Sequence, residues 1–227
     1  MSSALVIGNS DGIGLGFSKK LLKLGWTVTG ISKSESPIQT GSYRHYIADV
    51  NDREYNHRLQ SVLQNKDQMD LCLYCAGIGE LLNPLDMGKE VETIDVNLTG
   101  MIKTLAVVIP AMVENGHGHF IGLSSVADEM LSPEAPAYHA SKAGMSNYLE
   151  SLALALKPKG IYVTNVRFGF VDTKMAKGDV KPFMMGVDKA CEHLLYCMAK
   201  KPVRYTAPKI IIPLTKFRQY MLKLKTL

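Results

Sequence analysis

Tyr138 and Lys142 are the residues of this sequence whose types and spacing best suit proton transfer. On a helix, a separation of four residues places the phenol and the ammonium group on one face, one turn apart. A phenol has an ordinary pKa of about 10 and exchanges protons poorly at neutral pH, whereas a nearby cation favours its ionised form. We therefore expect Lys142 to lower the pKa of Tyr138. Taken alone, the pair also fits two surface residues of a helix.

Ser125 lies thirteen residues before Tyr138, at the end of an apolar run that also contains Ser124. The run predicts a buried strand, and ligands of doubly wound folds bind at the carboxyl ends of such strands. Ser125 can donate a hydrogen bond to a substrate oxygen there. Strand-end or helix-cap hydrogen bonding is the alternative for either serine, and we expect it to apply to one of them.

A glycine-rich turn with the spacing GxxxGxG follows the first apolar run of the chain. Glycine suits positions that need a positive φ, a close approach to a ligand, or tight packing of helix against strand. The N–H groups of such a turn and of the helix after it can bind a pyrophosphate. A tight turn without a ligand is the alternative, but the place after the first strand favours a dinucleotide site. The residues of the turn are Gly8, Ser10, Asp11, Gly12, Ile13 and Gly14.

Ser32 and Lys33 follow the second predicted strand, where an NAD site would carry an acidic residue for the ribose hydroxyls. A carboxylate there would repel a 2'-phosphate, whereas a small hydroxyl and a lysine attract one. The pair therefore favours NADP(H), with NAD(H) as the alternative. Two observations weaken this preference, because Lys33 also fits a solvated loop lysine and Asp11 adds a negative charge nearby.

Short apolar runs alternate with longer amphipathic segments along the whole chain, which is typical of a parallel sheet with helices on both faces. We predict an α/β protein with a three-layer, doubly wound Rossmann fold and a mainly parallel sheet of about seven strands. The expected strands are residues 4–8, 27–32, 45–48, 71–76, 119–124, 162–168 and, more weakly, 203–206. The expected helices are residues 12–24, 53–64, 88–114, 138–157 and 188–200. Residues 34–44 contain Pro37 and Gly41 and predict a loop in place of a helix.

The composition predicts one globular domain: 227 residues, 46% apolar, 21% charged, with a mean hydropathy of +0.02. These values exclude disordered, collagen-like and disulfide-stabilised classes. The net charge of +5 is uneven, because residues 200–227 hold eight of the 26 basic residues and none of the 21 acidic ones. We therefore divide the chain into a Rossmann-type dinucleotide-binding and catalytic domain, residues 1–207, and a basic amphipathic C-terminal segment, residues 208–227.

The C-terminal segment places apolar side chains on one face of a predicted helix. We favour packing of this face on the core or on a partner subunit over contact with a membrane surface. The apolar residues are Leu214, Phe217, Met221 and Leu224, with Lys216 and Lys223 off their face.

No apolar run approaches the roughly 18 residues that span a membrane, and residues 1–8 lack the features of a signal peptide. We therefore expect a cytoplasmic protein. We also expect neither nucleic acid as a partner nor a metal site. Cys72 and Cys75 lie in a predicted strand and point to opposite faces, so they fit small buried hydrophobes better than a metal or redox pair. Cys191 and Cys197, on a predicted helix, fit the same interpretation.

Together, the glycine-rich turn, Ser125 and the YxxxK pair resemble the compact single-domain branch of the short-chain dehydrogenase/reductase family. Four further segments are similar to family motifs, so that the resemblance covers residues 4–175. They are Asp49-Val50 for the adenine-contacting pair, Cys75-Ala76-Gly77 for an Asn-Ala-Gly turn, residues 95–100 around Asn97 for the segment with the catalytic asparagine, and residues 168–173 for the Pro-Gly segment beside the nicotinamide.

The resemblance implies an NAD(P)H-dependent oxidoreductase that interconverts a carbonyl and an alcohol on a small molecule, and a homodimer. It assigns the carbonyl-binding role to Ser125, because the family's serine precedes its tyrosine by thirteen residues. The implied catalytic residues are Asn97, Ser125, Tyr138 and Lys142. The implied cofactor contacts are the turn residues above with Ser32, Lys33, Asp49, Val50, Cys75, Ala76, Gly77, Tyr138, Lys142, Gly169, Val171 and Thr173. A non-catalytic dinucleotide-binding regulator and a membrane-surface adaptor are the alternative functions.

Three positions depart from the family pattern: Cys75 replaces an asparagine, Phe168 replaces a proline, and Asp11 stands where NADP enzymes often have a basic residue. We expect the first two to cost stability or shape. Residues 174–186 correspond to the family's mobile lid over the substrate and mix apolar side chains with lysines. They fit a pocket for a lipophilic or anionic carbonyl compound, with ordinary packing and solvated lysines as the alternative.

Overall fold

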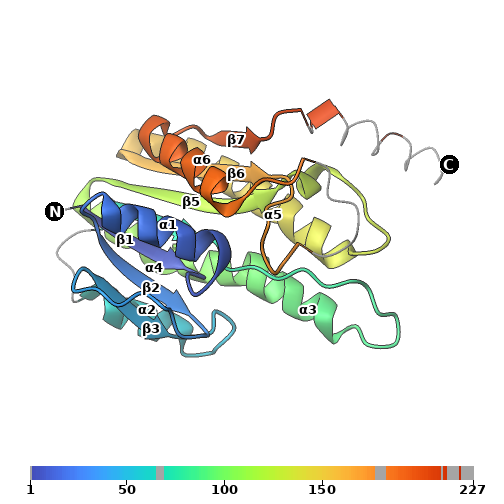
Figure 1. The fold of residues 1–227 in the computed structure, drawn as a ribbon, viewed down its shortest axis with the longest axis horizontal. Coiled ribbons are helices and arrows are strands. Elements are labelled where there is room, and N and C mark those ends of the chain that lie inside the picture. The colour runs from blue at the N-terminus through green and yellow to red at the C-terminus, as the bar shows by residue number, and fades with distance from the viewer. Residues whose placement is uncertain (1, 65–68, 177–182, 211, 214–219, 221–227) are drawn as a thin grey trace.

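The computed structural model describes residues 2–64, 69–176, 183–210, 212, 213 and 220. Seven described strands form one parallel sheet in the order β3-β2-β1-β4-β5-β6-β7 (Figure 1). Their bounds are β1 Ser3–Ile7, β2 Thr27–Ser32, β3 Tyr43–Ile47, β4 Leu71–Tyr74, β5 Gly118–Ser125, β6 Ile161–Phe168 and β7 Arg204–Ala207. The chain winds outward from β1 to β3 and then returns to β4 on the other side of β1. Since ligands of doubly wound folds bind at this reversal, the carboxyl ends of β1 and β4 mark the expected binding crevice.

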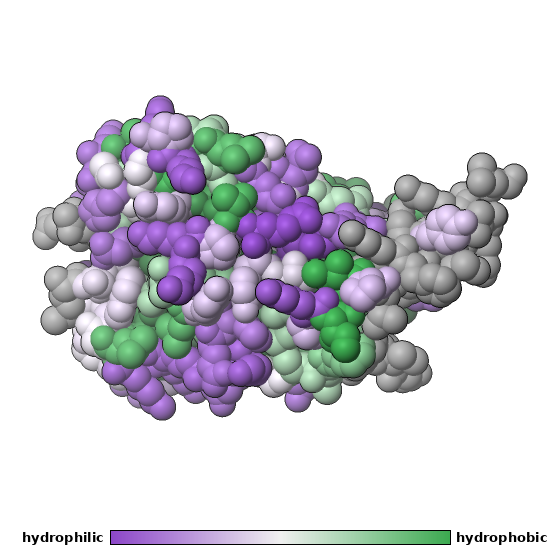
Figure 2. Space-filling model, turned by 90° about the horizontal axis from the view of Figure 1, so that it is seen from above, coloured by the Kyte–Doolittle hydropathy of each residue, from purple (hydrophilic) through white to green (hydrophobic). Residues whose placement is uncertain are grey.

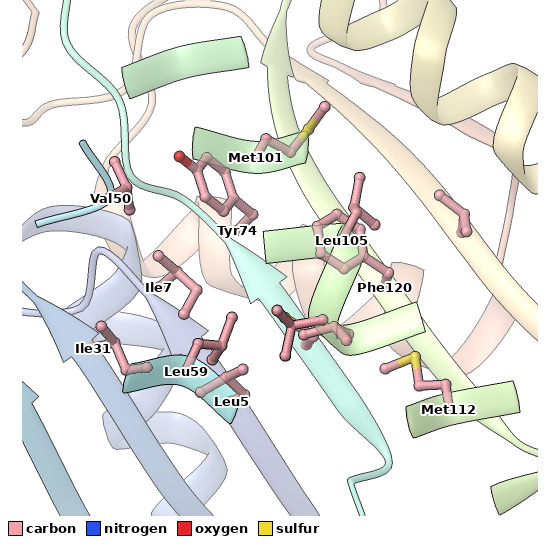
Figure 3. Close-up of a cluster of buried hydrophobic side chains, with 14 of the residues drawn as sticks. Leu5, Ile7, Ile31, Val50, Leu59, Tyr74, Met101, Leu105, Met112 and Phe120 are labelled. Carbon is pink, nitrogen blue, oxygen red and sulfur yellow. The ribbon is translucent and has the colours of Figure 1, made fainter. Parts of the chain in front are cut away.

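Helices cover both faces of the sheet, so the predicted three-layer α/β fold is confirmed (Figure 1). α1 Gly12–Lys23 and α6 Val187–Lys200 pack on one face; α2 Tyr55–Gln64, α4 Gly100–Asn115 and α5 Pro136–Leu156 pack on the other. Side chains along β1 alternate between the two hydrophobic cores. Leu5 and Ile7 face α2 and α4, whereas Ala4 and Val6 face α1. Figure 3 shows the first of these cores.

The helix expected at residues 88–114 and the starts of α2 and α5 differ from the prediction. The expected helix 88–114 is divided into α3 Gly88–Ile94, a π-helical segment Asp95–Thr99 and α4. A π turn inserts an extra residue into a helix and is frequent at functional sites. α5 begins at Pro136, two residues before the expected start, because proline suits the first turn of a helix. The residues between β2 and β3 form the predicted loop.

The continuous helical run Gly88–Asn115 is long and apolar enough to span a membrane by length and composition, whereas the sequence predicted no such run. Half of its most apolar window is buried inside the protein, and Met101, Leu105 and Met112 belong to the core of Figure 3. A core helix passes the same test. The hydrophilic surface in Figure 2 is interrupted by separate hydrophobic areas.

Cys72 and Cys75 pack into the cores on opposite faces of the sheet, as predicted. The apolar face expected in the C-terminal segment, Leu214, Phe217, Met221 and Leu224, lies outside the described residues. Its packing stays a prediction.

His119 gives the fold a pH dependence that can be measured. It is 3% exposed on β5, and its Nε2 lies 2.8 Å from the Thr164 hydroxyl on β6. Burial, with a smaller effect of Lys201, lowers its pKa to about 3. In the unfolded chain His119 takes up a proton near pH 6.5, whereas in the folded chain it stays neutral. The free energy of unfolding therefore falls as the pH drops below about 6.5. We expect the free energy of unfolding to fall by roughly 2 kcal/mol from this group between pH 7 and 5.

Urea unfolding at the two pH values checks this expectation. His119→Gln keeps a hydrogen-bonding side chain but does not titrate, so its loss between pH 7 and 5 should be smaller by the same amount. An equal loss in both proteins would show that His119 does not carry the effect.

Candidate active site

The glycine-rich turn after β1 has no room for side chains where it meets its neighbours. A Cβ atom on Gly14 would lie 2.2 Å from the Gly8 carbonyl oxygen and 2.6 Å from the Cys75 sulfur. Gly8 and Gly12 have φ values of +83° and +52°, which disfavour other residues. The turn leads directly into α1, whose first N–H groups have no helical acceptor. This open cradle at a helix N-terminus fits the phosphates of a dinucleotide.

Asp11 caps α1 and is paired with a lysine from the opposite side of the crevice. Its Oδ1 accepts a hydrogen bond of 2.7 Å from the Gly12 N–H, and its Oδ2 lies 2.6 Å from Lys174 Nζ. The bond to Lys174 is the main reason that the pKa of Asp11 lies below its usual value. Both side chains are exposed, so the pair adds little stability. The negative charge that counted against NADP(H) is thus matched by a cation.

Asn97 projects from the π-helical segment and joins the loop after β4 to α5. Its Oδ1 accepts 2.8 Å from the Ile78 N–H, and its Nδ2 donates to the Ile78 carbonyl at 2.9 Å and to Ser141 Oγ at 2.9 Å. Ser141 in turn donates to the Tyr138 carbonyl at 2.7 Å. The Asn97 side chain therefore bonds to the loop after β4 and to α5.

Tyr138 and Lys142 lie on one face of α5, as predicted, with Lys142 Nζ 5.7 Å from the centre of the Tyr138 ring. Lys142 Nζ donates to the Leu123 carbonyl of β5 at 2.9 Å. Burial lowers the pKa of Lys142 to about 8. Burial raises the pKa of Tyr138, Ser125 opposes this rise, and Asp128 adds to it. The expected lowering of the Tyr138 pKa is therefore wrong for this structure, because loss of solvent is the largest effect on the phenol.

The two serines at the end of β5 have different partners. Ser125 donates to the Phe168 carbonyl at 3.3 Å and accepts from the Ala127 N–H at 3.2 Å, and it is near enough to Tyr138 to lower the pKa of that phenol. Ser124 instead donates to the Lys142 carbonyl at 3.1 Å. Ser125 is thus both the serine beside the phenol and the cap of the 3-10 turn Val126–Glu129.

Other expected site residues gather at the same edge. A Cβ on Gly77 would lie 3.2 Å from Asn97 Oδ1 and 3.8 Å from Lys142 Nζ, and one on Gly12 would lie 3.2 Å from the Thr173 methyl group. Cys75 donates to the carbonyls of Ile7 and Gly8 at 3.0 and 3.3 Å, so it braces β1 in place of the family's asparagine. Also at the carboxyl ends of the strands are Ser10, Ile13, Ser32, Lys33, Asp49, Val50, Ala76, Gly169 and Val171.

Ser32, Lys33, Asp49 and Val50 are separated from Tyr138 by β1 and β4. These four lie on the far side of β1, at the ends of β2 and β3. Phe168, which replaces a proline, is buried in the core that also contains α6. Of the lid, residues 177–182 lie outside the described part of the chain, so Lys177 and Lys181 are not placed.

Two residues that support the site are not singled out by the sequence. Glu90 on α3 accepts a hydrogen bond of 2.9 Å from the Ala137 N–H and so caps the N-terminus of α5, where Ala135 provides no side-chain cap. Asn9 is buried in the glycine-rich turn and donates to the Tyr43 hydroxyl at 2.6 Å. Of these two residues, only Asn9 lies inside a motif, the GxxxGxG turn.

The sequence matches the family model for short chain dehydrogenases over residues 2–182. The chain belongs to the short-chain dehydrogenase/reductase family. It is 30% identical over 204 residues to an uncharacterized oxidoreductase of Myxococcus xanthus, covering 84% of this chain and 81% of that one. It is 28% identical over 184 residues to a 3-oxoacyl-[acyl-carrier-protein] reductase of Buchnera aphidicola, covering 77% and 75%.

Solved structures agree on the fold. A short chain dehydrogenase from Burkholderia cenocepacia, in complex with NADP, superposes with a TM-score of 0.84 at 21% identity and covers 95% of this chain and 91% of its own. The membership confirms the expected family and the Rossmann fold. Members of this family are oxidoreductases that bind nicotinamide dinucleotides and small-molecule substrates.

Proposed function

We propose that this protein uses NADP(H) to reduce a carbonyl group to an alcohol, or to catalyse the reverse reaction, with Asn97, Ser125, Tyr138 and Lys142 as its catalytic set. One observation carries the proposal: the Tyr138 phenol interacts with Ser125, which lowers its pKa, and lies beside Lys142, at the sheet edge that also holds the glycine cradle. A regulator that only senses a dinucleotide has no need of a proton donor at this place.

The side chains of this site divide the work of carbonyl reduction. A bound reduced nicotinamide supplies the hydride. Tyr138 gives its phenolic proton to the oxygen on which negative charge develops, and Ser125 donates a hydrogen bond to the same oxygen. Lys142 holds a positive charge beside the phenol and offers N–H donors to the cofactor ribose. Asn97 fixes the backbone of the Tyr138 turn through Ser141.

A panel of carbonyl compounds, assayed by oxidation of NADPH and of NADH, tests the proposal. The panel should include 3-oxoacyl thioesters, because the matched Buchnera protein is named a 3-oxoacyl reductase. It should also include lipophilic ketones and aldehydes, because Met175, Phe183 and Met184 expose apolar side chains in the segment after β6. Turnover of at least one compound is expected, and no oxidation of either cofactor across the panel would count against the proposal.

The preference for NADP(H) rests on the end of β2. No carboxylate stands there, Ser32 donates to the Ser34 carbonyl at 2.8 Å, and Lys33 is exposed. We expect Lys33→Glu to weaken NADPH binding about tenfold or more, because it replaces an attraction for the 2'-phosphate by a repulsion, and to change NADH binding little. Fluorescence titration of both cofactors measures this.

Lys23→Glu is the matched control, since Lys23 is exposed at the opposite end of α1. It makes the same change of charge far from the carboxyl edge and should leave both affinities near the wild-type values. Equal effects of Lys33→Glu on NADPH and NADH would refute a role in 2'-phosphate binding.

A cytoplasmic homodimer completes the proposal. Exposed apolar side chains on α4 and α5, Ile102, Val113, Tyr148 and Leu154, offer a surface for a second copy. Gel filtration of the full chain would distinguish a dimer from a monomer.

A further inference from the structure

A buried ion pair lies directly behind the candidate catalytic residues. Arg167 on β6 donates from Nε to Asp128 Oδ2 at 2.7 Å and from Nη2 to Asp128 Oδ1 at 2.6 Å. The side chains of Arg167 and Asp128 are 3% and 2% exposed. Burying two charges costs solvation that their attraction does not always recover, so stability alone is a poor explanation for such a pair. Its position between the elements of the site suggests another role.

Asp128 is joined to the Lys142 turn of α5 through two serine hydroxyls. Ser146 Oγ donates to Asp128 Oδ2 at 2.5 Å and lies 2.8 Å from Ser124 Oγ. Ser124 Oγ donates to the Lys142 carbonyl at 3.1 Å. Because Ser146 is four residues after Lys142, the carboxylate is held against the same face of the helix that carries the lysine.

The same ion pair fixes the strand ends around Ser125. Asp128 lies in the 3-10 turn that Ser125 caps, and Arg167 directly precedes Phe168, whose carbonyl accepts the Ser125 hydroxyl at 3.3 Å. The ends of β5 and β6 and the turn of α5 thus meet at one carboxylate. A shift of Asp128 would move Ser125 and Lys142 relative to each other.

The cluster around the pair carries an excess of negative charge. Arg167 also lies 3.1 Å from Glu129, and Arg204 on β7 pairs with Glu129 at 2.9 Å and with Glu150 at 2.7 Å. Three carboxylates therefore face two guanidinium groups. The ammonium group of Lys142, 4% exposed, donates to a neutral carbonyl, and Asp128 raises the pKa of both Lys142 and Tyr138.

We propose that Asp128 is a positioning residue for the reaction: held by Arg167, its carboxylate joins the Ser125 end of β5 to the Lys142 turn of α5 and balances the Lys142 ammonium. The inference rests on the proposed function of Tyr138 and Lys142. Charged and titratable groups surround Tyr138 and Lys142 in the described elements. They are Asp128 and Glu129 after β5, Arg167 on β6, Cys75 after β4, Glu90 on α3, and His139 and Glu150 on α5.

Asp128→Asn tests the charge in the full-length protein, because it keeps the shape of the side chain. Loss of a negative charge favours the phenolate of Tyr138 and the neutral amine of Lys142, so both groups should titrate at lower pH. We expect the rise of kcat/KM with pH in alcohol oxidation to move down by about 0.5 unit or more, with a lower kcat. A profile at the wild-type pH would overturn the proposal.

Glu150→Gln is the matched control. Glu150 lies on α5, the helix that carries Lys142, and accepts hydrogen bonds of 2.7 Å from Asn165 and Arg204. Glu150→Gln removes one negative charge, as Asp128→Asn does. A purely structural cluster predicts that both variants lose stability and keep the pH profile. The proposal predicts that only Asp128→Asn shifts it.

Ser146→Ala tests the positioning effect of Asp128 separately from the effect of its charge. It also tests the proposal if Asp128→Asn does not fold. It removes the bond from α5 to the carboxylate but keeps the ion pair. We expect a lower kcat with an unchanged pH profile and an unchanged affinity for NADPH. A wild-type kcat in this variant would overturn the positioning role.

A readout without turnover separates failure of this inference from failure of the proposed function. Ionisation of Tyr138 is measured as the difference in ultraviolet absorbance between each protein and its Tyr138→Phe counterpart during a pH titration. Asp128→Asn should lower this pKa relative to the wild type even where no carbonyl compound is reduced. An unchanged pKa contradicts the inference, whereas absence of turnover in the wild type contradicts the proposed function.

Discussion

Replacing Tyr138 by phenylalanine should lower kcat for carbonyl reduction by a factor of about 10²–10⁴ and leave the affinity for NADPH nearly unchanged. The substitution removes one hydroxyl group, which interacts with Ser125 and is the proposed proton donor. The ring itself keeps its packing against the loop after β4, where a Cβ on Gly79 would lie 3.2 Å from it. Binding of the cofactor uses the glycine cradle, which the change does not touch. Steady-state kinetics and fluorescence titration measure the two effects separately.

Tyr148→Phe provides the control for Tyr138→Phe. Tyr148 lies on the same helix, ten residues further along, and its side chain is partly exposed. Loss of its hydroxyl should leave kcat near the wild-type value. If Tyr138→Phe retained wild-type turnover, Tyr138 could not be the proton donor and the assignment of the catalytic set would be abandoned.

Arg167→Met should lower the free energy of unfolding by about 3–5 kcal/mol. The change leaves the Asp128 carboxylate buried without its cation and with Glu129 as a near neighbour, which is the costly way to break a buried ion pair. Arg204→Met is the comparison, because Arg204 is 45% exposed and exposed pairs contribute about 1 kcal/mol or less each. Urea unfolding at neutral pH measures both variants.

The double variant Arg167→Met with Asp128→Asn sharpens this stability test. Removal of the carboxylate charge should recover part of the stability lost in Arg167→Met, since the uncompensated charge is then absent. Losses that simply add, or a loss in Arg167→Met no larger than in Arg204→Met, would show that the pair is not buried as described.

The sequence by itself determined the fold and most of the candidate site. Alternation of apolar runs with amphipathic segments predicted the parallel sheet and its two layers of helices, because these periodicities are local properties of the chain. The site followed, since the carboxyl ends of parallel strands meet at one edge of a sheet and the motif residues come directly after those ends. The glycine-rich turn, Ser125 and the Tyr138–Lys142 pair could therefore be placed together from the sequence alone.

Only the tertiary structure decided which side chains support that site and how they titrate. Asp128 and Arg167 are 39 residues apart, and Asn97 meets Ser141 across 44, so no local pattern marks either contact. The pKa of Tyr138 rises where spacing alone predicted a fall, because burial is the largest effect on the phenol and is not set by spacing along the helix. Packing between distant elements determines which side chains are exposed to solvent and which charges are paired. Exposure and charge pairing in turn determine the pKa values of the residues that lie at this edge of the sheet.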